Sequence, residues 1–84
     1  MKSNISKSSY CRYYIQVTNN DKSKYLAFDR NNNYCLMPNI LNSRCIKFDN
    51  YTFAKNWLHY NHHSFNHILT ADSKVKIIDI GDIK

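Results

Sequence analysis

Only one stretch of the sequence has helical periodicity, and most other apolar segments are short runs of strand-forming residues bounded by Asn, Asp or Ser. Within residues 53–69 the apolar side chains share one arc of a helical wheel, and polar side chains occupy the opposite arc. Residues 10–18 alternate instead, with Ile15 and Val17 on one side. One helix and several strands within 84 residues predict a single α+β domain.

The turns of this chain have to be made largely without glycine or proline, because it contains one of each. Asn, Asp and Ser make up most of residues 19–23 and 30–33, and their side chains favour turns by bonding nearby backbone. These breaks separate the first strand from predicted strands at 24–29 and 34–37, the latter ended by Pro38. The first half therefore predicts a three-stranded meander.

The second half is less regular. Residues 39–44 are ambiguous, and 45–48 fit either a short strand or the approach to a helix. The β-branched run at 74–80 predicts a last strand. We expect a flexible N-terminal tail at residues 1–9 and a single domain at 10–84, an antiparallel sheet of three to five strands with one main amphipathic helix packed on one face.

The start of the helix is signalled by Asp49, whose carboxylate can cap the first turn, and by Phe48 and Phe53, spaced as a hydrophobic staple. Its end is open, because residues 61–64 have weak helix propensity and could stop it near Tyr60. The core is expected to contain Ile15, Val17, Leu26, Phe28, Leu36, Phe53, Trp57, Leu58, Ile77 and Ile78.

The net charge of +6 favours anionic partners and argues against an acidic mimic of DNA. The basic residues are scattered, so a role in solubility is the alternative. The sequence has neither an apolar run long enough to span a bilayer nor a signal-peptide core, so we expect a soluble protein without membrane partners. The abundance of Asn, Lys, Ile and Tyr suggests a low-GC source, and we place the protein in the cytoplasm of a bacterial host cell.

Three features could carry chemistry, and each has a simpler explanation. Cys11, Cys35 and Cys45 are odd in number and irregularly spaced, so we expect buried reduced thiols. The four histidines suit a metal by spacing but lack a nearby carboxylate, so we expect a solvated polar face, no metal and no cofactor. Nothing places a thiol beside an imidazole, so we expect no enzymatic activity. The histidines are His59, His62, His63 and His67.

The outward side of the first strand is the candidate binding surface. It sets Tyr10, Arg12 and Tyr14 beside Tyr25, a mixture of rings and charge that can stack bases or anchor a protein interface. The alternative is that tyrosines simply favour strands. The predicted contact residues are Tyr10, Arg12, Tyr14, Lys24 and Tyr25, extended by Arg44 and Lys47.

The order of core residues resembles that of small phage and prophage proteins of low-GC Gram-positive bacteria, anti-CRISPR proteins among them. The resemblance is carried by residues 13–15, 24–26, 46–48, 53–58 and 76–80, a hairpin, an aromatic-rich helix and a last strand. It implies a non-enzymatic protein that inhibits a host defence nucleoprotein complex, such as a CRISPR effector, by stoichiometric binding.

The first part is also similar to the arm-type DNA-binding domain of phage integrases, in which three strands pack on one helix. The catalytic domain of integrases is absent and a fourth strand is added. This likeness implies the alternative function, a small basic DNA- or RNA-binding regulator that uses a Tyr/Arg sheet face. A third alternative is a structural virion or scaffold component.

Overall fold

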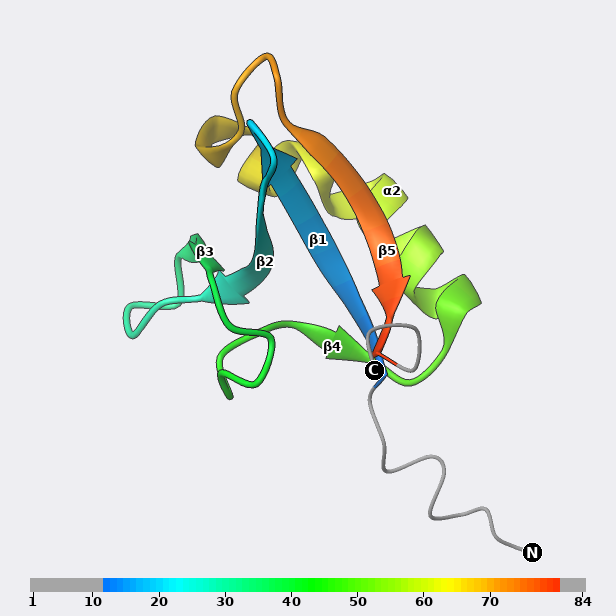
Figure 1. Cartoon of the computed structure of the whole chain (residues 1–84). Coiled ribbons are helices and arrows are strands. Elements are labelled where there is room, and N and C mark those ends of the chain that lie inside the picture. The colour runs from blue at the N-terminus through cyan, green and yellow to red at the C-terminus, as the bar shows by residue number, and fades with distance from the viewer. Residues whose placement is uncertain (1–11, 81–84) are drawn as a thin grey trace, which may run out of the picture.

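The computed structural model describes residues 12–80 as a five-stranded antiparallel sheet with one helix, which confirms the α+β fold (Figure 1). The predicted tail at residues 1–9, together with Tyr10 and Cys11, lies outside the described residues. The elements, in chain order, are β1 (Tyr13–Asn19), β2 (Lys22–Phe28), β3 (Tyr34–Met37), β4 (Lys47–Phe48), α2 (Tyr51–Phe65), the 3₁₀ helix η1 (Asn66–Ile68) and β5 (Lys74–Asp79).

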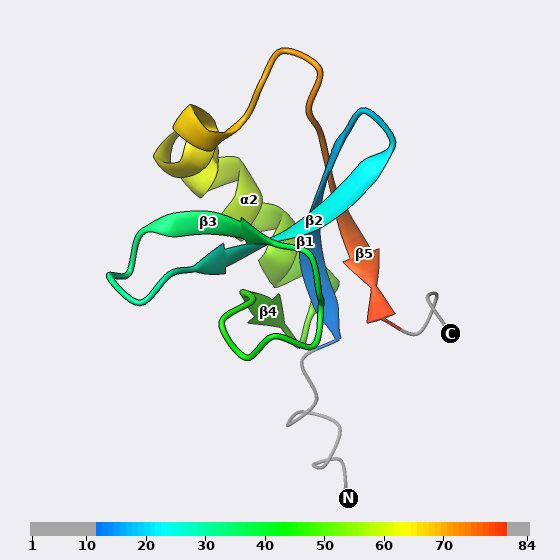
Figure 2. The same ribbon diagram turned by 60° about the vertical axis from the view of Figure 1, so that its left-hand side comes forward.

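Strand β1 is the centre of the sheet and pairs with three other strands. One edge of β1 pairs with β5 over almost its whole length. Its other edge pairs with β2 in its second half and with β4 at Tyr13 and Tyr14. Where β2 leaves β1, it bonds instead to the segment before β4, with the Ile46 amide donating to the Leu26 carbonyl at 3.0 Å. The sheet consequently curls, as Figure 2 shows.

The first hairpin turn uses the residues that the sequence predicts, but it is tighter. Asn20 and Asp21 have φ of 50° and 69°, so both central residues of the turn are left-handed. That is the type I′ geometry which matches the twist of a two-residue hairpin and favours Asn and Asp. As a result β2 starts at Lys22, two residues before the predicted start.

The helix cap is shifted by one residue from the prediction. The side-chain oxygen of Asn50, and not the Asp49 carboxylate, accepts a hydrogen bond from the Phe53 amide at 2.9 Å. The predicted contact between Phe48 and Phe53 is present, with ring centroids 5.8 Å apart in an edge-to-face arrangement. The helix also runs past Tyr60 to Phe65, so the weak propensity of residues 61–64 is overridden by the burial of Phe65.

The two candidate caps can be separated by substitution. We expect Asn50→Ala to lower the free energy of unfolding by about 1 kcal/mol, because it leaves the Phe53 amide without its acceptor. Asp49→Ala should change it by less than about 0.5 kcal/mol. Urea denaturation of both variants measures this difference, and an equal loss in the two would contradict the assignment of the cap.

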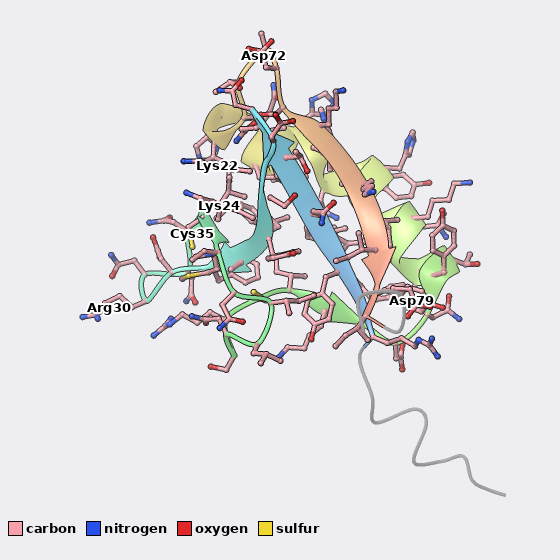
Figure 3. The ribbon with its side chains drawn as sticks, in the orientation of Figure 1. Lys22, Lys24, Arg30, Cys35, Asp72 and Asp79 are labelled. Carbon is pink, nitrogen blue, oxygen red and sulfur yellow. The ribbon has the colours of Figure 1, made fainter. Side chains whose placement is uncertain are left out.

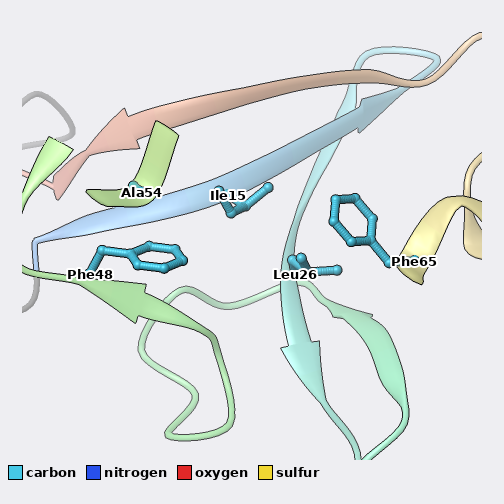
Figure 4. Packing of buried hydrophobic residues seen from close by; sticks show 5 residues of the cluster. All are labelled: Ile15, Leu26, Phe48, Ala54 and Phe65. Atoms are coloured by element: carbon cyan, nitrogen blue, oxygen red, sulfur yellow. The ribbon is translucent and has the colours of Figure 1, made fainter. Parts of the chain in front are cut away.

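The main core lies between the sheet and α2 (Figure 4). Ile15, Val17 and Leu26 are buried as predicted. The prediction that Phe53 belongs to the core is wrong, because 59% of its surface is exposed. It sits about 100° around the helix from the fully buried Ala54, beyond the edge of the buried arc. The other predicted core residues are partly buried, and Ile78 lies on the opposite side of the sheet.

Candidate binding surface

The face of the sheet opposite α2, called the far face from here on, is the surface on which the candidate residues have to be judged. Figure 1 looks onto it, with α2 behind β1 and β5. Because directly opposite residues of antiparallel strands share a face, the strand register assigns its residues. Lys76, Gln16 and Tyr25 form one row across β5, β1 and β2. The adjoining rows are Lys74–Thr18–Ser23 and Ile78–Tyr14–Lys47.

Tyr14 lies on the predicted face, but only 6% of its surface is exposed, so the expectation that its ring faces solvent is wrong. It packs in a second apolar cluster with Ala27 and Cys45, against which Ile40 and Ile78 also pack. The connection between β3 and β4 folds back over this end of the far face and supplies Ile40 and Cys45. The sequence left that connection ambiguous, so its role as a cover was not foreseen.

Arg12 is half exposed, but its guanidinium is engaged within the chain. Its Nε and Nη2 atoms donate to the two carboxylate oxygens of Asp79 at 2.8 and 2.9 Å. The guanidinium carbon also lies 5.8 Å from the centre of the Tyr13 ring. A two-point arginine–carboxylate pair of this kind offsets the positive charge, so Arg12 is a poor anchor for an anionic partner.

Lys24 does not share a face with Tyr25. It is paired with the buried Val17 and therefore belongs to the side of the sheet that carries α2. Figure 3 shows Lys22 and Lys24 extending from β2 on the side away from β1. Of the predicted contact residues in the described strands, Tyr14, Tyr25 and Lys47 lie on the far face, where Tyr14 is buried, Tyr25 half-buried and Lys47 exposed.

Lys74 and Lys76 are far-face cations that the sequence-based prediction missed, although the K-V-K alternation at the start of the last strand places both on one side. Both are exposed. An open depression of about 530 Å³ is lined by Lys76–Asp79 of β5, by Gln16 and Tyr25 of the far face, and by Tyr13 and Tyr51 from the side that carries α2. The far face thus combines Gln16, Tyr25, Lys47, Lys74 and Lys76.

Among the carboxylates of residues 12–80, Asp79 is the one that lines the depression shared by Lys76, Gln16 and Tyr25. Asp79 is paired with Arg12, and Asp29 accepts hydrogen bonds from the Asn31 and Asn33 amides at 2.7 and 2.9 Å. Asp21 and Asp72 lie in turns and line, together with Lys74, a second depression at one end of the sheet. The positive potential of the far face therefore rests mainly on Lys76 and Lys47, and is weakest near Lys74.

The connection between β3 and β4, which packs over one end of this face, carries an exposed apolar side chain. Leu41 is 78% exposed, and Arg44, the remaining predicted contact residue, is also exposed. The Leu41 and Arg44 amides donate to the Asn39 and Asn42 side-chain oxygens, each at 2.8 Å. Backbone hydrogen bonds from the Asn42 and Cys45 amides close both turns at 3.0 Å. We call residues 38–46 the anchor loop; its conformation is held by these bonds.

The described cysteines do not form a reactive site. Cys35 and Cys45 both lie directly opposite Ala27, on its two sides, which separates their Cα atoms by about 10 Å, too far for a disulfide. Burial raises the pKa of both thiols; a nearby Asp29 charge adds to this for Cys35, whereas Lys47 opposes it for Cys45. Cys45 is buried as expected, and Cys35 is partly exposed.

The histidines of α2 and η1 are exposed. His59, His62 and His63 border a shallow depression with Lys55 and Leu58. Within residues 12–80, no group of three or more His, Cys, Asp or Glu side chains is placed to hold a metal ion.

Comparison with known proteins leaves the structure as the main guide to function. Across residues 12–80, no helix combines the length and the apolar character that a membrane crossing requires. No protein-family model, enzyme families included, matches the sequence, and no curated protein or solved structure is significantly similar to this chain.

Proposed function

We propose that this chain is a non-enzymatic binding protein that inhibits a host defence nucleoprotein complex by occupying one of its surfaces. The observation that carries the proposal is the exposed Leu41 on the hydrogen-bonded anchor loop, which also carries Arg44 and packs over one end of the far face. A loop whose backbone is already fixed by hydrogen bonds loses less conformational entropy on binding, and apolar anchors with cationic neighbours are typical of protein interfaces.

The chemistry of the described side chains supports binding over catalysis. A nucleophilic cysteine needs a lowered pKa and access to substrate, whereas burial raises the pKa of both described thiols. The depression beside Lys76 is open, and the one carboxylate that lines it, Asp79, is engaged by Arg12. The phage-like order of core residues supports a defence complex, with a CRISPR effector as the first candidate.

The test is affinity capture from a lysate of a low-GC Gram-positive bacterium, with and without nuclease, followed by an activity assay of the captured complex. We expect the wild-type chain to retain one complex in fixed stoichiometry and to inhibit it. Leu41→Ala should weaken retention at least ten-fold, because the apolar anchor is lost. The matched control is Tyr60→Ala, which removes another exposed large apolar side chain, 79% accessible, from α2.

Two results would contradict the proposal. One is the failure of the folded wild-type chain to retain or inhibit any complex. The other is an equal loss of retention in Leu41→Ala and Tyr60→Ala, which would mean that the anchor loop has no special part in binding.

A further inference from the structure

We propose that the far face binds a single strand of nucleic acid, with backbone phosphates on Lys76 and Lys47 and a base stacked on Tyr25. This rests on the proposed function and names the component of the nucleoprotein complex that the sheet contacts. It differs from the surface predicted from the sequence, because Tyr14 is buried and Arg12 is engaged with Asp79.

The row Lys76–Gln16–Tyr25 places a cation, an amide and a phenol ring side by side on adjacent strands. Neighbouring strands are about 4.8 Å apart, so the Lys76 and Tyr25 backbones are separated by about 10 Å. That spacing lets one nucleotide bridge the row, with its phosphate at the Lys76 ammonium and its base over the Tyr25 ring. The amide of Gln16, between them, can both donate and accept hydrogen bonds and so can meet any base edge.

Charge complementarity favours an anionic ligand. Lys47 lies across β1 from β5, one row away from Lys76, so the two ammonium groups flank the Gln16 position from opposite sides. None of the carboxylates among residues 12–80 belongs to the row of Lys76 or to that of Lys47. Two cations on either side of β1, with an aromatic ring on the same side as Lys47, suit a linear polyanion carrying bases.

A single strand fits this surface better than a duplex does. Stacking on Tyr25 requires an open base face, which a duplex hides between neighbouring base pairs. The anchor loop also packs over one end of the far face, at Tyr14, so the exposed part is a short platform. A flexible strand can follow such a platform, and its remaining bases are free to stack elsewhere.

The experiment measures the fluorescence anisotropy of labelled 12-nucleotide oligo(dT) and oligo(U), and of a 12-base-pair duplex, between 20 and 200 mM salt. Two or three phosphate contacts predict a slope of log K against log salt of about −1.4 to −2.1 for the single strands. Lys76→Ala should make this slope shallower by about 0.7, the value for one phosphate. Tyr25→Leu keeps apolar packing but removes the ring, and should weaken binding by about 5- to 100-fold with the slope unchanged.

The matched controls remove the same groups from other surfaces. Lys55→Ala and Lys22→Ala delete exposed lysines of α2 and β2, and Tyr60→Ala deletes an exposed ring. We expect each control to bind within two-fold of wild type, with circular dichroism confirming that every variant is folded.

Three outcomes would overturn the inference: no binding of either single strand at 20 mM salt, equal losses in the far-face and control variants, or tighter binding of the duplex. These outcomes are distinguishable from failure of the proposed function. If a host complex is still captured and inhibited in the presence of nuclease, and Tyr25→Leu has no effect on capture, the proposed function stands and the contact is to protein.

Discussion

Phe65→Ala is expected to lower the free energy of unfolding by about 3–5 kcal/mol, because Phe65 is the largest fully buried side chain among residues 12–80. Phe65 is fully buried at the end of α2 and stacks on Trp57, with ring centroids 6.1 Å apart and planes inclined by 7°. It also contacts Tyr34 of β3 at 5.7 Å, so one ring joins the helix to the sheet. For a domain of this size the loss corresponds to a fall of about 15–30 °C in Tm.

Differential scanning calorimetry and urea denaturation measure this loss, and Tyr60→Ala is the matched control. It removes a ring of similar size from the same helix, but 79% of that side chain is exposed, so the change should stay within about 0.5 kcal/mol. A Phe65→Ala variant within about 1 kcal/mol of wild type would show that α2 is not fixed to the sheet at this point.

The fold could be predicted from the sequence to the extent that its signals are local. Alternation at β1, the Asn-Asp turn and the helical period over α2 each depend on neighbouring residues, and all three are confirmed. The helix cap was predicted one residue too early and the start of β2 two residues too late, because local signals do not fix the exact ends of an element. Asp49 and Asn50 are both good caps, and only the packing of Phe48 against Phe53 and Trp57 fixes which of them the chain uses.

The candidate site was harder to predict, because it depends on contacts between distant parts of the chain. Arg12 pairs with Asp79, which lies 67 positions further along the sequence, and nothing in the sequence around either residue predicts this contact. Strand β4 and the anchor loop fill the space between β1 and β2 at the point where these two strands separate. The strands separate because the sheet curls, and strand periodicity does not predict that curl. Lys24 was predicted to join Tyr25 in one surface, but adjacent residues of a strand point to opposite faces, and the register places Lys24 opposite Val17.

Tyr14 shows most clearly how a binding residue and a core residue can look alike in sequence. Alternation placed it correctly on the side of β1 away from Ile15, and that side was expected to face solvent. The anchor loop, which buries Ile40 and Cys45 against it, converts the same position into a second core. The two interpretations make opposite predictions about stability.

We expect Tyr14→Ala to lower the free energy of unfolding by about 3 kcal/mol or more, because it opens a cavity beneath the anchor loop, whereas an exposed binding residue would change it by less than about 1 kcal/mol. Tyr14→Phe keeps the ring and removes only the hydroxyl, so its cost should not exceed about 1.5 kcal/mol. Urea denaturation gives both values, and labelling of Cys45 adds a local readout, since this thiol lies in the same cluster and should become reactive only in Tyr14→Ala. If Tyr14→Ala is as stable as wild type and Cys45 stays protected from labelling, the Tyr14 ring does not support the loop. Tyr14 would then again be a candidate contact residue.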